Sequence, residues 1–485
     1  MKRIYLILAL TITGLSYPQS QFQEFINYVN SLTDSLDKAA AIDSFMIVAR
    51  EQGIPFIEDS TANFIYLGTP NTVTVPGDFN GWDPNSHSMT NLTQTNFWYY
   101  SANFEMNARL DYKFVLNGSN WILDPENPNT ILGGFGPNSE LAMPEYVQPW
   151  EIEFNPNIAH GTVEDISIFS NHLNDTYQLK IYLPPGYTIS SSTLYPAVYF
   201  QDGFEYIDLA SAVNVLDNLL DSIIIDPLIS IFVKPNDRNE EYAFIKRNQY
   251  RLFFIEELVP FVDSIYNTIP DAENRLVLGP SFGGNISALI AYNHPDVFGT
   301  CGIQSGAFWP NNFEVYNMII NGPIEDITWS SIWGSYEGLA ENMRDFRDFL
   351  LTNNYELDWL VLPEGHSWGL WRSTIDRMLK YVFPSTTTGV EDEETHLPEI
   401  FPLYQNYPNP FNPTTKIKFR TEDTGFVSLK VYDILSNEIA TLVNNIKPAG
   451  AHEIIFNAAG LSSGVYFYTL QAGKHIETRK MTLLH

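Results

Sequence analysis

A serine between glycines is the first residue of this chain whose setting suggests chemistry. The sequence Gly-Pro-Ser-Phe-Gly at 279–283 follows the apolar run Leu276–Leu278 and precedes a stretch typical of a helix start, residues 286–292. This order predicts a strand, a tight turn and a helix, in which small residues let the backbone push the Ser281 hydroxyl out above a parallel sheet. The pattern favours Ser281 as a nucleophile. The alternative is a glycine-rich loop that contains a serine by chance.

A serine hydroxyl is a weak nucleophile at neutral pH, so Ser281 needs a base. Between residues 150 and 385, only His294 and His366 follow Ser281. His294 lies just past the predicted elbow helix, where packing or capping is expected. His366 follows the apolar run Trp359–Leu362 on a loop at a predicted strand's carboxyl end, so the sequence predicts His366 as the base.

A carboxylate must orient that histidine, and ten acidic residues lie between Cys301 and His366. Glu337 fits best, because it follows the apolar pair at 332–333 in a glycine-bounded turn and precedes a predicted helix over 339–351. Asp358 precedes its strand and therefore belongs at the opposite edge of the sheet. Asp326 and Asp358 stay open as alternatives to Glu337.

Composition and charge narrow the class of protein. The chain has 485 residues, which suggests about three domains, and 57 Asp and Glu against 26 Lys and Arg give a formal charge of −31. Such a charge disfavours binding to nucleic acid or anionic membranes. The single cysteine, Cys301, excludes an intrachain disulfide. No His and Cys cluster has metal-ligand spacing, so neither a metal nor a cofactor is expected.

Composition also divides the chain. Residues 1–20 combine a basic start with a short apolar run and predict an export signal, and no later stretch is long enough to cross a membrane. The expected order of the remaining parts is a short helical segment (21–57), a β-sandwich (58–147), an α/β domain with a largely buried sheet (148–386), an acidic linker (387–398) and a second β-sandwich (399–485). In the α/β domain, strands are expected at 179–183, 197–200, 229–233, 276–278, 300–303 and 359–362, and helices at 253–266 and 339–351.

Six motifs in the α/β domain occur in the order seen in the family described as putative esterases. They are Tyr182–Tyr187, Phe200–Gly203, Arg238–Tyr242, Glu257–Pro260, the Ser281 turn and Gly365–Arg372. This family is similar to enterochelin esterases, feruloyl and acetyl-xylan esterases and mycolyltransferases. The resemblance implies an α/β-hydrolase fold and hydrolysis of carboxylic esters.

The resemblance also implies roles for particular residues. The family carries Gly-x-x-Asp or Gly-x-x-Glu before its last strand, which Gly334 and Glu337 match. Its oxyanion hole is built from backbone N–H groups, here those of Phe282 and Phe204. Its motifs further imply that Asp202, Arg238 and Tyr242 bind substrate.

The two flanking parts carry resemblances of their own. Gly77–Trp82 resembles glycogen-binding-like modules, in which Trp82, Trp98 and Trp121 would stack on sugars, although such aromatic residues are often core. Residues 407–413 open a segment that closely resembles the type IX secretion C-terminal sorting domain. That implies the type IX machinery as a partner and a protein secreted or attached to the cell surface via the periplasm. An ordinary accessory sandwich is the alternative.

The substrate stays open between classes. Acyl esters of polysaccharide, feruloyl or acetyl, are favoured by the export and sugar-module resemblances. A siderophore trilactone is the alternative, and a basic cluster would suit that anionic ligand: Lys234, Arg238, Lys246, Arg247 and Arg251. A third possibility is a non-catalytic secreted binding protein on a hydrolase scaffold.

Overall fold

The chain forms two compact units, Met1–Val390 and Glu391–His485. A computed structural model describes residues 20–134 and 136–386, and in the second unit residues 403, 406, 411–421, 425–433, 437–447, 450–472 and 475–483. The predicted export signal, apart from Ser20, and the predicted acidic linker lie outside the described residues. Among the described residues, no helix is both long enough and apolar enough to cross a bilayer.

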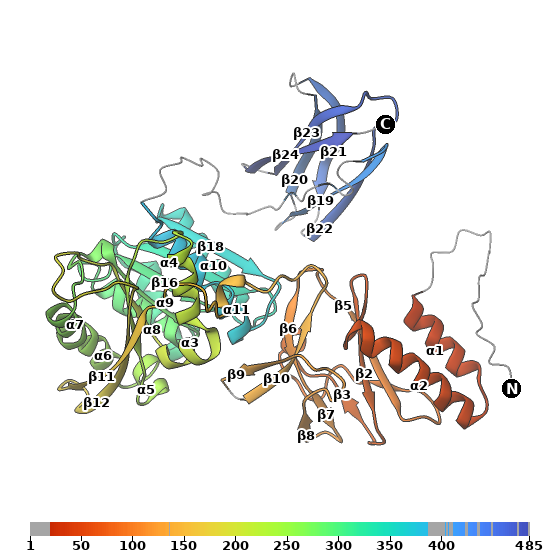
Figure 1. The fold of residues 1–485 in the computed structure, drawn as a ribbon, viewed down its shortest axis with the longest axis horizontal. Coiled ribbons are helices and arrows are strands. Elements are labelled where there is room, and N and C mark those ends of the chain that lie inside the picture. Colours follow the sequence, from red (N-terminus) through yellow and green to blue (C-terminus); the bar gives the residue numbers. More distant parts are fainter. Residues whose placement is uncertain are drawn as a thin grey trace. The chain divides into compact units, whose positions relative to one another are not determined.

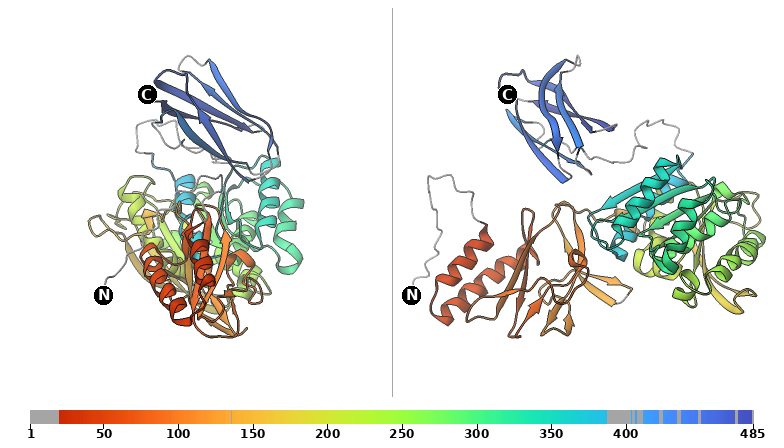
Figure 2. Two further views of the ribbon diagram at one scale, coloured as in Figure 1. Left: turned by 90° about the vertical axis from the view of Figure 1, so that its right-hand side faces the viewer. Right: turned by 180° about the vertical axis from the view of Figure 1, so that it is seen from behind.

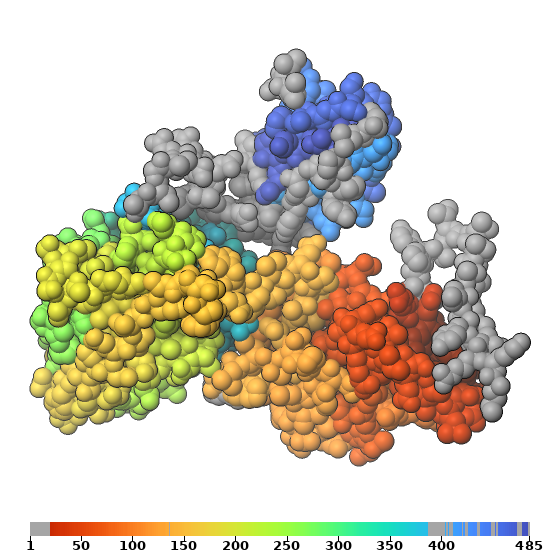
Figure 3. Space-filling model, in the orientation of Figure 1, coloured from red at the N-terminus to blue at the C-terminus, as the bar shows by residue number. Residues whose placement is uncertain are grey.

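Two helices open the first unit, as the sequence predicted. Helix α1 (Gln21–Ser31) is capped by the Ser20 side chain, and α2 (Ser35–Gln52) is capped by Asp34. Their apolar side chains pack on the first sheet of the β-sandwich, with Phe22, Ile26 and Met46 in one cluster with sheet residues such as Phe97. In Figure 3 the atoms of this helical segment, in red, lie directly against those of the residues that follow it, in orange.

The first sandwich consists of three small antiparallel sheets. One has the order β1-β2-β5-β4: Phe56–Glu58, Thr61–Leu67, Phe97–Asn103 and Thr90–Asn91. The second is β6-β10-β9: Arg109–Tyr112, Gly136–Ala142 and Thr130–Gly133. The third is β3-β7-β8: Val73–Thr74, Phe114–Leu116 and Asn120–Ile122. Their shared core includes Phe64, Leu110, Tyr112 and Leu141, and a 3-10 turn, η1 (Asp78–Asn80), lies within the predicted sugar-module motif.

The α/β domain is built on one eight-stranded sheet (Figures 1 and 2) with the order β11-β12-β14-β13-β15-β16-β17-β18. The strands are β11 (Thr162–Ser170), β12 (Asp175–Leu183), β13 (Ala197–Phe200), β14 (Ile229–Val233), β15 (Arg275–Pro280), β16 (Thr300–Gln304), β17 (Thr328–Gly334) and β18 (Leu357–Leu362). The pairings of β11 with β12 and of β12 with β14 are antiparallel, and all others are parallel.

Two strands of this sheet were not among those predicted. Strand β11 is largely exposed and carries acidic residues, so it lacks an apolar run. Strand β17 has Thr and Ser in its first half, and only its apolar end was recognised. Both are in the sheet because tertiary pairing overrides weak local preference.

Helices cover both faces of the sheet. On one face, Val198 and Phe200 of β13 pack in a cluster with α3 (Gly203–Ala210), α4 (Ala212–Asp221) and α12 (Ile375–Val382). On the other, Tyr199 meets Phe254, 6.2 Å between ring centroids. The remaining helices are α5 (Arg238–Tyr242), α6 (Arg247–Leu252), α7 (Val259–Ile265), α8 (Phe282–Asn293), α9 (Pro310–Asn321), α10 (Ala340–Thr352) and α11 (Trp368–Arg372), with 3-10 turns η2 (Trp150–Ile152) and η4 (Ala272–Asn274).

The helix predicted over 253–266 needs a correction. Residues Phe253–Leu258 form a π-helical segment that joins α6 to α7. Pro260 lies in the first turn of α7 and has no N–H, so it cannot continue an α-helical hydrogen-bond ladder from residue 256. A π segment accommodates the change.

The second unit is a separate antiparallel sandwich. One sheet has the order β21-β20-β23-β24: Glu438–Lys447, Gly425–Tyr432, Gly464–Ala472 and His475–Leu483. The other pairs β19 (Thr414–Thr421) with β22 (Gly450–Asn457). Its core is apolar and includes Ile417, Leu429, Tyr468 and Met481.

Candidate active site

Ser281 lies in a strained turn between β15 and α8. Its φ is 56° and its ψ is −119°, a backbone conformation that non-glycine residues rarely adopt. Backbone hydrogen bonds hold the turn: the Ser281 N–H donates to Gln304 (2.8 Å), and the Ser281 carbonyl accepts from Gly284 (3.1 Å), Asn285 (3.2 Å) and Ala307 (3.0 Å).

Glycine is required at two positions of this turn. A Cβ on Gly279 would lie 2.6 Å from the carbonyl carbon of Gly283, and a Cβ on Gly283 would lie 2.8 Å from the Pro280 ring. Pro280 is the last residue of β15, so its missing N–H removes a donor only where the strand ends.

His366 and Glu337 are brought together. The His366 Nδ1 lies 2.9 Å from Glu337 Oε2, and the histidine side chain is 34% exposed whereas the glutamate is fully buried. The other carboxylate oxygen, Oε1, accepts from the Gly334 N–H at 2.8 Å and from the Ser305 hydroxyl. Ser305 in turn accepts from the Trp371 indole N–H at 2.9 Å. Both carboxylate oxygens are therefore fixed.

Gly334 is explained by the same geometry. A Cβ there would lie 2.1 Å from the Glu364 carbonyl oxygen, so only glycine lets the two loops approach. Of the alternative acids, Asp358 pairs with Arg377 at 2.6 Å, and Asp326 is exposed on the loop before β17.

Four residues of this constellation share one edge of the sheet. Ser281 follows β15, Ser305 follows β16, Glu337 follows β17 and His366 follows β18, all at the carboxyl ends of parallel strands. Ligands bind at this edge in open α/β sheets. Among the described residues the Ser281 hydroxyl has no hydrogen-bond partner, and such contacts are often long without substrate.

Phe282 and Phe204 lie in the first turns of two neighbouring helices. Phe282 begins α8 after β15, and Phe204 is the second residue of α3 after β13; β13 and β15 are adjacent and parallel. First-turn N–H groups have no acceptor within their own helix, and the positive end of a helix favours an anion.

Asp202, Arg238 and Tyr242 form a hydrogen-bonded group that contacts the Ser281 turn through Pro280. Arg238 donates to both carboxylate oxygens of Asp202 at 2.7 Å and to the Pro280 carbonyl at 3.3 Å. The Asp202 N–H donates to the Tyr242 hydroxyl at 3.0 Å. Asp202 and Tyr242 are 2% and 0% exposed, so the implied direct substrate contact does not fit their burial. Arg238, with 37% of its side chain exposed, is the one of the three that a ligand can reach.

An aromatic cluster beside Ser281 escaped the sequence analysis. The ring of Phe282 lies 5.2 Å from that of Trp309 and 6.2 Å from that of Phe244, centroid to centroid. Trp309 is 48% exposed. The signal was available, because Trp309 follows the buried strand β16 by only five residues at the carboxyl edge. Ser305, directly after that strand, was also missed, although its position gave the same signal.

The remaining sequence candidates have structural partners. His294 accepts from Arg251, and Arg247 pairs with Glu314 at 2.5 Å. Lys246 lies 3.9 Å from Asp237. Lys234 lies over the Phe204 ring at 5.6 Å from its centroid, beside Lys180 at 5.1 Å, which the sequence did not single out.

The three predicted sugar-stacking residues differ. Trp82 donates its indole N–H to Asp78 at 3.0 Å, and Trp98 donates to the Gly68 carbonyl at 3.1 Å. Trp121 is 41% exposed.

Comparison with known proteins identifies two domains. Residues 170–348 match the family described as "Putative esterase", and residues 405–483 match the "Secretion system C-terminal sorting domain". The predicted fold class, an α/β-hydrolase domain flanked by all-β sandwiches, is confirmed.

Three relatives match the esterase region. An uncharacterised Bacillus subtilis protein, YjcH, is 28% identical over 240 residues, 46% of this chain and 97% of its own length. The endo-1,4-beta-xylanase/feruloyl esterase of Xylanibacter ruminicola is 26% identical over 164 residues, 32% of this chain but 23% of that protein. The iron(III) enterobactin esterase of Escherichia coli is 26% identical over 250 residues, 46% of this chain and 61% of that protein.

A solved structure shares the fold over a longer stretch. The enterobactin esterase FES from Shigella flexneri has a TM-score of 0.57 and 20% identity, and the match covers 66% of this chain and 92% of that one. The matched share is larger than the α/β domain alone. The family match over residues 170–348 and these relatives support a carboxylic ester hydrolase in the central domain, and residues 405–483 match a secretion-system sorting domain.

Proposed function

We propose that this protein is an exported serine esterase in which Ser281 is the nucleophile, His366 the general base and Glu337 the acid that orients it. The observation that carries the proposal is the 2.9 Å contact between the buried Glu337 carboxylate and His366 Nδ1, at the sheet edge that also presents the strained Ser281 turn. Burying a carboxylate without partners is costly. Contacts with Gly334 and Ser305 fix one carboxylate oxygen, so that the other faces His366.

This geometry supports a two-step mechanism. Because Nδ1 faces Glu337, Nε2 is the ring nitrogen free to accept the Ser281 proton as Oγ attacks the ester carbonyl carbon. The oxyanion that forms is stabilised by the N–H groups of Phe282 and Phe204. His366 then gives its proton to the leaving alcohol, and water, activated by the same nitrogen, releases the acid from the acyl-enzyme.

The aromatic cluster favours an acyl group that carries a ring. Phe282, Trp309 and Phe244 offer stacking surface next to the nucleophile, which an acetyl group would leave unused. We therefore infer feruloyl-type esters of polysaccharide as the substrate class, ahead of acetyl esters. A relative named as an endo-1,4-beta-xylanase/feruloyl esterase supports this class.

A siderophore trilactone is the second candidate. Arg238 lies 5.8 Å from the Phe282 ring centroid with part of its side chain exposed, and Lys234 lies near Phe204. These cations would suit an anionic catecholate. The similarity to iron(III) enterobactin esterase supports it as well.

Export is the third part of the proposal. The sorting domain points to secretion or attachment to the cell surface. We propose that the signal at 1–20 takes the chain to the periplasm and that the type IX machinery then recognises residues 399–485.

The test compares three substrates on the wild type and Ser281→Ala: p-nitrophenyl acetate, a feruloylated oligosaccharide and a catecholate trilactone. We expect Ser281→Ala to lower kcat by about 10⁴-fold or more on each substrate that is turned over. Ser264→Ala is the matched control, because its hydroxyl bonds only the Phe261 carbonyl of its own helix. Equal rates for the wild type and Ser281→Ala would refute the serine mechanism. A higher kcat/KM for the trilactone than for the feruloyl ester would reverse the substrate order.

A further inference from the structure

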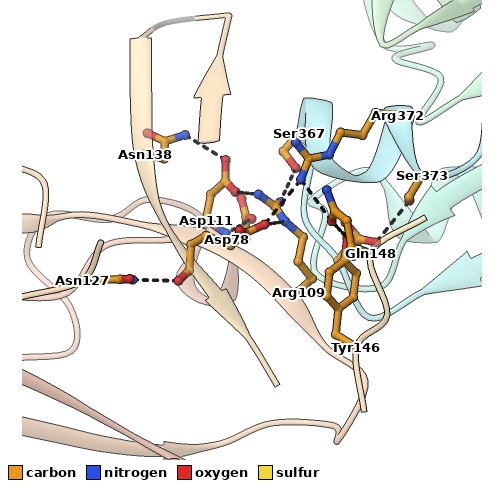
Figure 4. A network of polar contacts seen from close by, with 12 residues as sticks. Asp78, Arg109, Asp111, Asn127, Asn138, Tyr146, Gln148, Ser367, Arg372 and Ser373 are labelled. Carbon is orange, nitrogen blue, oxygen red and sulfur yellow. Dashed lines mark hydrogen bonds and ion pairs between the residues drawn. The ribbon is translucent and has the colours of Figure 1, made fainter. Parts of the chain in front are cut away.

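The first sandwich reaches into the loop that carries His366. Arg109, at the start of β6, is fully buried, and its backbone N–H donates to the Pro363 carbonyl at 3.1 Å. Its guanidinium donates to the Ser367 hydroxyl at 3.2 Å (Figure 4). One sandwich residue thus bonds the loop on both sides of His366.

Asp78, in the turn η1, makes a second contact with the same loop. A Cβ on Gly365 would lie 2.0, 2.3 and 2.4 Å from three atoms of the Asp78 side chain. A Cβ on Gly369 would lie 2.1 Å from the Arg109 guanidinium. Both glycines of the Gly-His-Ser-Trp-Gly sequence therefore make room for side chains of the sandwich.

Asp78 and Arg109 are themselves held firmly. The two oxygens of Asp78 accept from the Trp82 indole at 3.0 Å and the Asp111 N–H at 2.7 Å. Arg109 pairs with Asp111 and with Glu140, each at 2.6 Å. The motif that resembles a sugar-binding module thus uses its tryptophan to fix an aspartate against the histidine loop.

The first sandwich also contacts the loop that carries Glu337. Tyr336 donates its hydroxyl to Glu105 of the sandwich at 2.6 Å, and its ring lies 6.3 Å from that of Phe104. The Tyr336 N–H donates to the Glu364 carbonyl at 3.1 Å. The two loops are therefore joined to each other and to the sandwich.

We propose that Asp78 and Arg109 are positioning residues of the hydrolytic site, so that the first sandwich sets the turnover number. This inference rests on the proposed role of His366. A part-exposed histidine on a loop needs external support to keep its geometry. A shift of about 1 Å in a catalytic group can lower the rate by about a hundredfold.

The test inserts one methyl group at the contact. Gly365→Ala places a Cβ against Asp78, and we expect kcat for p-nitrophenyl acetate to fall by about tenfold to a hundredfold with KM nearly unchanged. The matched control is Gly338→Ala on the neighbouring loop, where a Cβ would meet nothing within 4 Å; it should keep wild-type kcat.

A rescue variant separates positioning from general damage. The three atoms nearest the new methyl all belong to the Asp78 side chain, so Asp78→Gly removes the obstacle. Asp78→Gly alone lowers kcat because the support is lost. In the double variant, the added methyl should cost no further activity. Circular dichroism confirms that each variant is folded.

Two results would overturn the inference. One is a kcat of Gly365→Ala within twofold of the wild type. The other is strict additivity of the Gly365→Ala and Asp78→Gly effects, which would place the damage in the loop itself. Ser281→Ala, measured in parallel, separates the two proposals. If Ser281→Ala is inactive, either result above refutes only the positioning role of Asp78 and Arg109. If Ser281→Ala is active, the serine esterase mechanism is refuted, and the positioning role is refuted with it.

Discussion

The two β-sandwiches of this chain have similar architecture and different interiors. The first buries charged side chains, among them Asp78, Arg109, Asp111 and Asp124. In the second, the buried polar residues that the structure describes are Asn406, Thr415 and Thr421, and no charged side chain is buried among its described residues. The rest of its described core is an apolar cluster.

We infer from this difference that the two sandwiches depend differently on the α/β domain. A buried charge persists only with partners, and part of the support for Arg109 comes from the α/β domain, through Ser367. The buried polar network of the first sandwich thus extends into the α/β domain. A core without buried charges needs no such partner.

The largest effect that this comparison predicts is on stability. Arg109→Leu removes the ion-pair partner of the buried Asp111 carboxylate and the nearer of the two arginines beside Glu140, so the free energy of unfolding of the first unit should fall by about 3–5 kcal/mol, measured by urea denaturation. Lys430→Leu breaks a 2.8 Å ion pair with Glu438 in the second sandwich, where both side chains are part-exposed. That change should be undetectable. Equal responses would remove the contrast between the two interiors.

The next effect is on turnover, at the loop that the first sandwich touches through Tyr336. Glu337→Gln should preserve the fold and lower kcat by about a hundredfold or more, because the amide no longer stabilises a protonated histidine. Glu341→Gln, on the exposed first turn of α10, is the control. Near-normal kcat in Glu337→Gln, with Asp326→Asn or Asp358→Asn crippled, would place the acid elsewhere.

The Arg109 contacts and the Glu337–His366 pair also show which parts of the fold and the site could be predicted from the sequence. The buried strands β13 to β16 were predictable from continuous apolar runs, and Glu337 and His366 from their positions after strands. Their proximity is now observed, whereas their catalytic roles stay predictions. The contact of Arg109 with Ser367 joins residues 258 positions apart, and no local pattern encodes such a pair. The burial of Tyr242 and the π-helical turn before Pro260 likewise depend on packing.

A smaller effect concerns pH. Burial raises the pKa of Glu364 to about 7, with the carboxylates of Asp111 and Asp78 adding to the shift and Arg109 and Arg372 opposing it. Burial also raises the pKa of Asp78 to about 7. Tyr146 and Glu140 lie near the same charged groups: Tyr146 interacts with Glu364, and Glu140 pairs with Arg372 at 3.6 Å. We call these residues together the buried charge cluster. The folded state therefore takes up protons that the unfolded state has released, so this cluster's contribution to stability is greatest below about pH 4 and is lost as the pH rises to about 7.

Glu364→Gln imitates the protonated acid and should flatten that part of the stability curve. The unfolding midpoint of the first unit is measured from pH 5 to pH 8 for the wild type and the variant. Glu438 of the second sandwich provides the contrast, because its hydrogen bond to Lys430 lowers its pKa. A lowered pKa gives the opposite sign, stability present at neutral pH and lost in acid, but solvent screens this exposed pair, so Glu438→Gln should leave the unfolding midpoint of the second sandwich unchanged across the same pH range. A wild-type slope in Glu364→Gln would mean that Glu364 does not titrate in this range.

The smallest effect expected on catalysis comes from removing the second sandwich altogether. The cut belongs after Val390, where the second unit begins, because Thr386 still donates its hydroxyl to Asp226 at 2.9 Å and Ser385 its N–H to Ile224 at 3.1 Å. Since every residue of the proposed site lies in the first unit, kcat should stay within twofold of the full-length value and the unfolding midpoint of the first unit should not move. Export should fail, with the truncated enzyme accumulating in the periplasm, as fractionation and activity assays would reveal. A truncated protein that is folded but inactive would mean that the second sandwich contributes to the site, and the contrast between a sandwich that supports catalysis and one that directs export would not hold.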